Sequence, residues 1–337
     1  MKKLKTNTQT KQRLVTLLIL VLIMVILSCI SNKYLTVNNL INIVRQESTL
    51  IIIACAATML MISGGMDLSP AGVIALTSVV FAKLCVAGIS IPLAALLSLL
   101  VGVAAGTFSG LLVVLANVPP MIATLGTWYI TKGLAYAISN SYAIVQGLPA
   151  NFGWVNRYIG PFPLMVVIAV AVFAVFYILL NRTLLGKYAY AIGGNSETAR
   201  LSGIKVNLVR CVLYILTALM SSFVILMSSR INSGDPNLST SGIEFEIIVA
   251  IILGGTSLLG GQGSLIGTLI GALILGNLSN GMNLLGIGTV YQFIVEGAVL
   301  VVAVVLDLTL KAFASRSCAG QTDLGSPTKN PDTRMIL

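Results

Sequence analysis

The sequence contains no histidine, and its five cysteines lie far apart among 337 residues. Without histidine, Ser-His-Asp and Cys-His catalytic sites and histidine-ligated metal centres are excluded. The cysteine spacing indicates neither a disulfide framework nor a Cys-x-x-Cys site. The phosphate-binding motif Gly-x-x-x-x-Gly-Lys-[Ser/Thr] is also missing, because Gly186-Lys187 is followed by Tyr188. We therefore expect a chain that is not an enzyme, with no catalytic residue, metal site or cofactor of its own.

Charged residues are scarce: they make up 9% of the chain, against 57% hydrophobic residues. A soluble domain is roughly a quarter charged, so this surplus of apolar side chains requires lipid. A membrane-spanning helix takes about 20 apolar residues. Apolar runs of suitable length lie at about 14–30, 48–64, 70–87, 91–116, 120–140, 161–180, 208–228, 245–260, 264–285 and 289–310. They predict an all-α, polytopic integral membrane protein with about ten transmembrane helices.

The orientation follows from the basic residues, because short cytoplasmic loops retain an excess of Lys and Arg. These residues concentrate in a tail at 1–13, in the interval 181–210, and in a tail at 311–337. Six runs precede the interval and four follow it, so both termini and the interval fall on the cytoplasmic side. The transmembrane domain is then 14–310, with a cytoplasmic loop at 181–207, and the last tail is expected to be disordered. A cleaved signal in place of the first run would break this parity.

Polar sequence is rare outside the tails. Apolar residues at 37, 40, 41 and 44 have helical spacing and predict a short helix lying along the membrane surface. Two Gly-rich segments interrupt apolar runs, and broken helices of this kind mark transport sites in other carriers. They predict a solute path, with ordinary turns as the alternative, lined by Gly64, Gly65, Asp67, Ser69, Gly254, Gly255, Thr256 and Ser257.

Glycines also recur four residues apart, a spacing that lets helices pack closely. The two sets are Gly102, Gly106 and Gly110, and Gly263, Gly267 and Gly271.

Four ionisable residues lie at membrane depth or beside it. Glu244 and Glu246 are expected at the outer interface in contact with water. Lys132 and Glu296 are deeper, where a charge costs about 2.5–3.5 kcal/mol and needs a partner, a cavity or a subunit interface. A proton- or sodium-coupled secondary carrier using Asp67, Lys132 and Glu296 is therefore one hypothesis for the function.

The longest internal polar stretch contains a capped turn. Asn195 or Ser196 can act as N-cap, the turn runs to Leu201, and Gly203 is a natural stop. Glu197 in the first turn and Arg200 in the last suit the helix dipole. This short surface helix is either a connector or a docking element for a cytoplasmic partner.

From Tyr34 to Asp307 the sequence resembles the permease subunits of bacterial ABC importers for ribose, xylose, arabinose and galactose. The segments that carry the resemblance are Asn38-Asn39-Leu40-x-Asn42-Ile43, Ser63-Gly64-Gly65-Met66-Asp67-Leu68-Ser69, Pro120-x-Ile122-Ala123-Thr124-Leu125-Gly126, Tyr190-Ala191-Ile192-Gly193-Gly194-Asn195 with Ala199-Arg200-Leu201-Ser202-Gly203-Ile204, and the Gly-rich block from Leu253 to Gly286.

The resemblance implies a permease in the bacterial inner membrane that imports a pentose or hexose. Close relatives handle autoinducer-2, and more distant ones nucleosides. Two permease copies, identical or different, would form the path. A separate ATPase with ATP and Mg would drive it, and a sugar-binding protein would dock on the outer loops at 142–158 and 230–242. The implied ATPase contact residues are Gly193, Gly194, Asn195, Glu197, Thr198, Ala199, Arg200 and Gly203.

Overall fold

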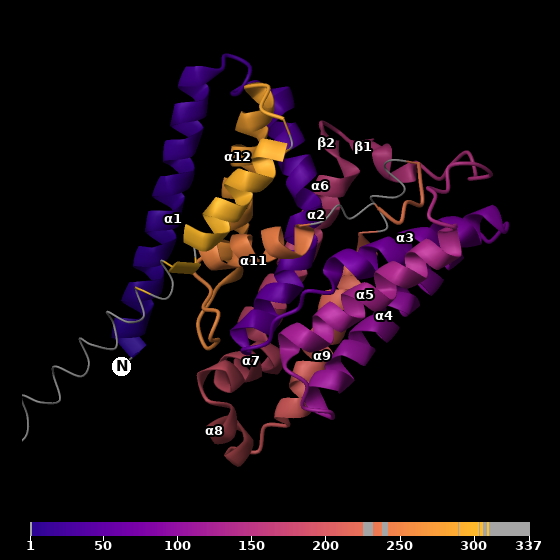
Figure 1. The fold of residues 1–337 in the computed structure, drawn as a ribbon. Coiled ribbons are helices and arrows are strands. Elements are labelled where there is room, and N and C mark those ends of the chain that lie inside the picture. The colour runs from indigo at the N-terminus through magenta and orange to yellow at the C-terminus, as the bar shows by residue number, and fades with distance from the viewer. Residues whose placement is uncertain are drawn as a thin grey trace, which may run out of the picture.

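The computed structural model describes residues 2–224, 232–237, 242–288, 290–302, 304–305 and 309. The predicted tail at 311–337 and parts of the second outer loop lie outside them. The structure is almost entirely helical (Figure 1). Its elements are α1 (Lys2–Ile30), α2 (Val37–Ile62), α3 (Pro70–Val86), α4 (Ile91–Val114), α5 (Pro120–Ser139), η1 (Trp154–Asn156), β1 (Tyr158–Ile159), β2 (Phe162–Pro163), α6 (Leu164–Arg182), α7 (Leu184–Gly194), α8 (Ser196–Leu201), α9 (Val206–Phe223), α11 (Ile243–Leu253) and α12 (Leu265–Leu284). A further apolar helix covers Val290–Val302.

Each of the ten apolar runs contains one of these helices. Among the described residues, five helices are long and apolar enough to cross a membrane: α2, α4, α6, α9 and α12. Three shorter apolar stretches lie at Leu14–Ile30, Pro70–Val86 and Val290–Val302. At 1.5 Å per residue, α11 is only about 16 Å long, roughly half of a hydrocarbon core. The eighth run is therefore a short helix followed by the Gly-rich segment, whereas a complete span was expected.

The surface helix expected at 37–44 does not exist as a separate element. Its residues form the first turns of α2, which continues to Ile62. The turn before α2 is held against α12: the Tyr34 hydroxyl donates to Asn277 Oδ1, and Asn39 and Asn280 exchange two side-chain hydrogen bonds of 2.9 Å each. A helix pinned in this way at its start has no reason to bend along the membrane surface.

Helix α2 is the centre of the molecule, and sixteen of its residues, from Ile43 to Ile62, are buried. Helices α3, α4, α5 and α9 pack together on one side of it, and α1, α11 and α12 on the other (Figure 1). Both predicted glycine contacts are confirmed. A Cβ atom on Gly106 would lie less than 3.0 Å from atoms of α9, and one on Gly271 less than 3.0 Å from the Ala250 carbonyl of α11.

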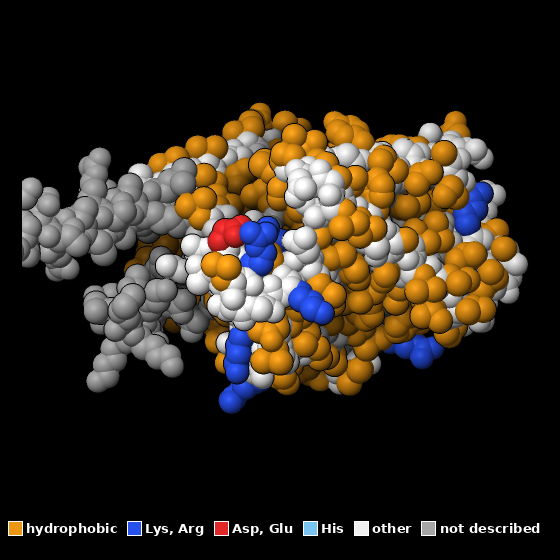
Figure 2. All heavy atoms as spheres, turned by 90° about the horizontal axis from the view of Figure 1, so that it is seen from below, with side chains coloured by type: hydrophobic (Ala, Val, Ile, Leu, Met, Phe, Trp, Pro, Cys, Tyr) orange, Lys and Arg blue, Asp and Glu red, His pale blue; other side chains and the backbone are white. Residues whose placement is uncertain are grey.

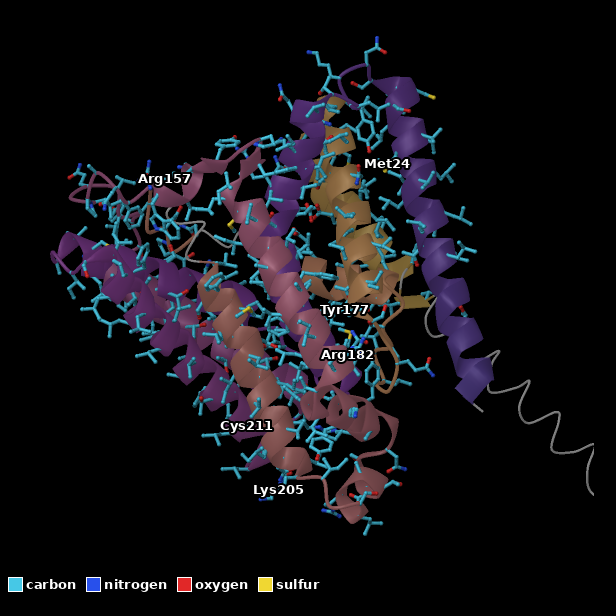
Figure 3. All side chains as sticks on the ribbon, turned by 180° about the vertical axis from the view of Figure 1, so that it is seen from behind. Met24, Arg157, Tyr177, Arg182, Lys205 and Cys211 are labelled. Atoms are coloured by element: carbon cyan, nitrogen blue, oxygen red, sulfur yellow. The ribbon has the colours of Figure 1, made fainter. Side chains whose placement is uncertain are left out.

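The two ends of the bundle differ in character. Helices α7 and α8 lie at the end from which α1 starts, and the β1–β2 hairpin lies at the opposite end (Figure 1). Arg157 is beside the hairpin, whereas Arg182 and Lys205 are at the α7–α8 end (Figure 3). This arrangement agrees with the expected parity, which places residues 1–13 and 181–210 on one side.

Candidate functional site

Helix α8 has the cap, bounds and stop that the sequence predicts. The Asn195 side chain accepts a 2.9 Å hydrogen bond from the Thr198 amide. Arg200 and Glu197 form an ion pair of 2.7 Å on the exposed side. The helix ends before Gly203, whose positive φ of 83° is one that glycine adopts without strain. Only Ala199 is buried, so the rest of the helix is available to a partner.

The exposed side of α8 includes a residue that sequence reasoning missed. Leu201 is 86% exposed, more than any other large hydrophobic side chain of the described residues. The sequence signal for it is a single large apolar residue in a six-residue helix whose only other apolar residue is Ala199. Figure 2 views the molecule from below, the end at which α8 lies in Figure 1, and shows a few charged side chains among hydrophobic ones. An exposed leucine beside an ion pair is suited to binding a partly apolar protein surface.

The two predicted Gly-rich breaks meet each other at this same end. The Gly261 amide donates a 2.8 Å hydrogen bond to the Ile62 carbonyl at the end of α2. A Cβ atom on Gly260 would lie 2.8 Å from the Gly64 nitrogen. Helix α7 joins them, because the Tyr190 hydroxyl donates a 2.8 Å hydrogen bond to the Gly263 carbonyl. Residues assigned separately to the path and to the ATPase contact thus form one cluster.

The first break, which holds Gly64, Gly65, Asp67 and Ser69, is covered by protein. Asp67 is 7% exposed, and its Oδ1 accepts a 2.8 Å hydrogen bond from the Ser69 amide. Burial raises the pKa of Asp67 to about 6, against the lowering effect of that hydrogen bond. The Tyr214 hydroxyl of α9, also unnoticed in the sequence, closes the break by donating to the Met66 carbonyl at 3.2 Å.

The second break divides its residues between packing and polar roles. Gly254 packs against Gly267 of α12, and Gly255 ends α11 with a φ of 80°. Ser257 Oγ accepts a 3.1 Å hydrogen bond from the Leu259 amide. The buried Thr256 hydroxyl has no hydrogen-bond partner among the described residues. Ser69 Oγ of the first break shares this property, so these two members of the predicted path have hydroxyls available to water or a solute hydroxyl.

Lys132 has an aromatic neighbour and, at longer range, two acidic residues, but no ion pair with any described residue. Its Nζ lies 5.5 Å from the centre of the Tyr136 ring, and the charges of Asp235 and Glu244 act on it. Glu244 is only 6% exposed, so the expectation that water surrounds it is wrong. The reason is tertiary: α11 packs against α2, α3 and α12.

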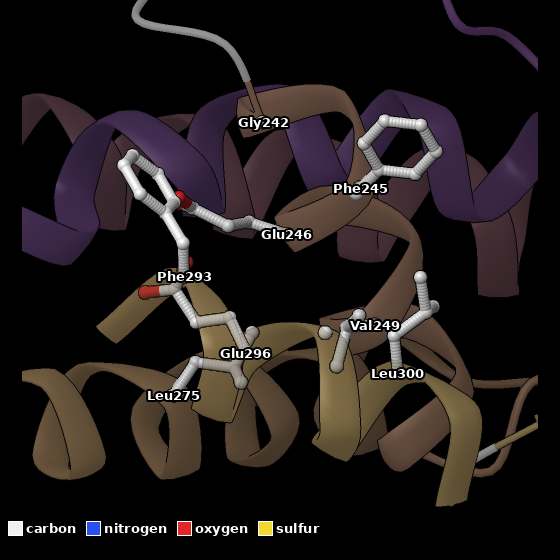
Figure 4. A pocket seen from close by; sticks show the side chains of 9 residues that line it. Gly242, Phe245, Glu246, Val249, Leu275, Phe293, Glu296 and Leu300 are labelled. Carbon is white, nitrogen blue, oxygen red and sulfur yellow. The ribbon is translucent and has the colours of Figure 1, made fainter. Parts of the chain in front are cut away.

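A cavity of about 240 Å³ lies between α11 and the helix Val290–Val302 (Figure 4). It receives the carboxylates of Glu246 and Glu296, and the charges of both act on a third, Glu47 of α2. The Ser279 hydroxyl donates a 3.4 Å hydrogen bond to Glu296. Sequence reasoning missed Glu47 because it sits at the polar edge of an apolar run. The lining residues are Gly242, Phe245, Glu246, Val249, Leu275, Phe293, Glu296, Gly297 and Leu300, none of them from the predicted path.

At the opposite end, the two loops that the sequence predicts to lie on the outer side are joined. Ile144 and Gly234 exchange backbone hydrogen bonds of 2.8 and 2.9 Å. Phe152 anchors the longer loop by stacking on Phe81, with ring centres 5.0 Å apart. Several large side chains are left exposed on the longer loop and hairpin: Tyr142, Val145, Tyr158, Ile159 and Phe162. This outer platform is apolar and aromatic, a composition typical of protein-binding surfaces.

Comparison with known proteins agrees with this architecture. Residues 39–304 match the family described as the permease component of the branched-chain amino acid transport system. The chain belongs to this permease family. The ribose import permease protein RbsC of Escherichia coli K12 is 39% identical over 298 residues, which are 87% of this chain and 92% of the relative.

Further relatives share most of their length with this permease. RbsC of Bacillus subtilis 168 is 37% identical over 300 residues, 88% of this chain and 92% of the relative. The D-allose transport system permease protein AlsC of Escherichia coli K12 is 35% identical over 298 residues, 87% and 90%. No solved structure matches the chain. The resemblance seen in the sequence is thus confirmed: the relatives are named as permeases and not as enzymes.

Proposed function

We propose that this permease is the membrane subunit of an ATP-driven importer that carries a small sugar, a pentose or hexose such as ribose or allose, across the bacterial inner membrane. The relatives' names support the sugar, and the apolar helices support the membrane. The observation that carries the ATP-driven part is α8, a capped helix whose charged side and Leu201 project from the bundle.

The proposed partners supply the functions that this membrane subunit does not carry out itself. A separate ATPase, holding ATP and Mg, docks on α8 through the exposed residues Glu197, Thr198, Arg200 and Leu201, whereas Gly193 and Ala199 of the predicted set face the interior. Two copies of the permease enclose the path, which includes the Gly-rich breaks and the Thr256 hydroxyl. A sugar-loaded binding protein docks on the outer platform, whose aromatic side chains offer contact area at low entropic cost. Selectivity among sugars lies mainly with that binding protein.

The proposal is tested by reconstitution in liposomes with the ATPase and binding protein that accompany the permease. Uptake of labelled ribose and allose is measured with and without ATP inside, alongside autoinducer-2 and a nucleoside. Sugar uptake that requires ATP is expected. Uptake that proceeds without the ATPase would contradict the proposal.

The docking assignment is tested by exchanging charges on α8. The double change Glu197→Lys with Arg200→Glu keeps the ion pair in reversed order, so the helix retains its internal contact. ATPase co-purification should fall about tenfold, which corresponds to about 1.4 kcal/mol of binding free energy. Arg157→Glu, a charge reversal at the opposite end, is the matched control and should leave co-purification unchanged. Equal co-purification of both variants would disprove docking on α8.

A further inference from the structure

Helix α7 touches both Gly-rich breaks at one residue, Gly193. A Cβ atom there would lie less than 3.0 Å from the Ile62 carbonyl oxygen and from the Gly261 nitrogen. These two atoms belong to the hydrogen bond that joins the end of α2 to the segment after α11. Gly193 therefore rests directly on the junction between the breaks, with backbone against backbone.

The contact is rigid as well as close. Flexible side chains can move aside, but the atoms facing Gly193 are backbone atoms held in a hydrogen bond. From the other side, a Cβ atom on Gly261 would lie 3.1 Å from the Gly193 carbonyl oxygen. The Tyr190 hydrogen bond to the Gly263 carbonyl holds the same surfaces together one turn earlier in α7. Close-packed backbone atoms compress very little, so a displacement of α7 displaces the backbone that it contacts.

Helix α7 is also connected directly to α8. The only residue between them is Asn195, and it caps α8 while its own amide donates to the Ala191 carbonyl of α7 at 3.1 Å. A displacement of α8 must therefore reach Gly193 within one turn of helix.

We propose that Gly193 is a positioning residue for transport: it transmits the movement of α8 to both Gly-rich breaks at once. This inference rests on the proposed function, because it takes α8 to be moved by an ATPase. It adds the route: α8, α7, the segment 254–264 and the end of α2 with its break move together as one body relative to α4.

The test is Gly193→Ala in the reconstituted importer. The added methyl group should separate α7 from the junction, so uptake of ribose per ATP hydrolysed should fall at least about fivefold. ATPase co-purification should stay at the wild-type level, because the exposed side of α8 is unchanged. Gly126→Ala in α5, where a Cβ atom meets nothing within 4 Å, is the matched control and should keep the wild-type ratio.

A second measurement decides the matter even if Gly193→Ala does not fold. Spin labels are placed at three exposed positions: Lys187 of α7, Leu259 of the second break and Leu96 of α4. Between the nucleotide-free and ATP-bound states, the distance from Lys187 to Leu259 should stay constant, while the distance from Lys187 to Leu96 changes. A changing distance from Lys187 to Leu259, or no change in either distance, would overturn the proposal.

The outcomes also separate this inference from the proposed function. If wild-type uptake does not require ATP, the proposed function fails. If wild-type uptake requires ATP and Gly193→Ala keeps the wild-type ratio of uptake to hydrolysis, only the role of Gly193 fails.

Discussion

Asp67 shows at the level of one residue how burial controls a charge. Its pKa of about 6 lies above the ordinary value of 3.8, so the folded protein binds the proton more tightly than the unfolded chain does. The contribution of Asp67 to stability is therefore greatest below about pH 4 and is lost as the pH rises through 6.

Asp67→Asn removes this pH dependence and keeps an oxygen that can accept from the Ser69 amide. We expect the variant to unfold at a higher temperature than the wild type at pH 8, and at a similar temperature at pH 4. The raised pKa corresponds to a free-energy difference on the order of 3 kcal/mol. Thermal unfolding of the detergent-solubilised protein between pH 4 and 8 measures the effect. A difference independent of pH would show that Asp67 is ionised in the fold at every pH tested.

Gly106 shows at the same scale how a missing side chain holds two helices together. Gly106→Ala would bring a methyl group within 3.0 Å of α9 backbone atoms, and overpacking of this kind costs about 1–3 kcal/mol. We expect a lower unfolding temperature. Gly133→Ala in α5, whose Cβ atom would meet nothing within 4 Å, is the matched control. It should be neutral or slightly stabilising, since alanine is favoured over glycine in helices. Equal losses in both variants would contradict the packing role.

At the scale of elements, sequence patterns located the helices but not the short connecting elements and contacts between them. Apolar periodicity and length fix where a helix lies in lipid, and the Asn195 cap fixes where α8 begins, because both signals are local. Helix α7, the β1–β2 hairpin and the early start of α2 were not predicted. Their positions depend on contacts between distant segments, such as Gly193 against Ile62 and Asn39 against Asn280.

The Asn39 and Asn280 pair carries a prediction at this scale, because it fastens the start of α2 to α12. Removing either amide leaves the other without its two hydrogen bonds. In a double-mutant cycle of Asn39→Ala and Asn280→Ala, each single change should destabilise the protein. The coupling free energy should be about 1 kcal/mol, as expected for partly buried side-chain hydrogen bonds. Unfolding temperatures of the four proteins give the cycle, and additive losses would mean that the pair does not hold the two helices together.

At the scale of the whole molecule, the candidate site could be predicted as two lists of residues but not as one cluster. Glycine pairs and a capped turn are visible in a sequence, whereas the meeting of α2, α7 and the second break is a property of the fold. The carboxylates of Glu47, Glu246 and Glu296 show the same limit. They come from three helices, and only the fold brings Glu246 and Glu296 to one cavity with Glu47 near enough for their charges to act on it.

The cavity with Glu246 and Glu296 is the observation that would favour ion coupling. Removing its charges therefore distinguishes an ATP-driven importer from an ion-coupled secondary carrier. Glu296→Gln keeps the shape of the cavity and an oxygen that can accept from Ser279, but it removes the charge. In an ATP-driven importer, uptake by this variant should stay within about twofold of the wild type, because twofold is about 0.4 kcal/mol and no step uses the charge. Dissipating the pH gradient with a protonophore should leave uptake unchanged in both proteins. Glu246→Gln, in the same cavity, should behave in the same way.

Loss of uptake in both variants, together with wild-type uptake that follows the pH gradient and persists without ATP, would establish a secondary carrier. The two mechanisms are distinguishable because an ATP-driven importer receives its energy from the ATPase docked on α8 and needs no titrating group inside the bundle.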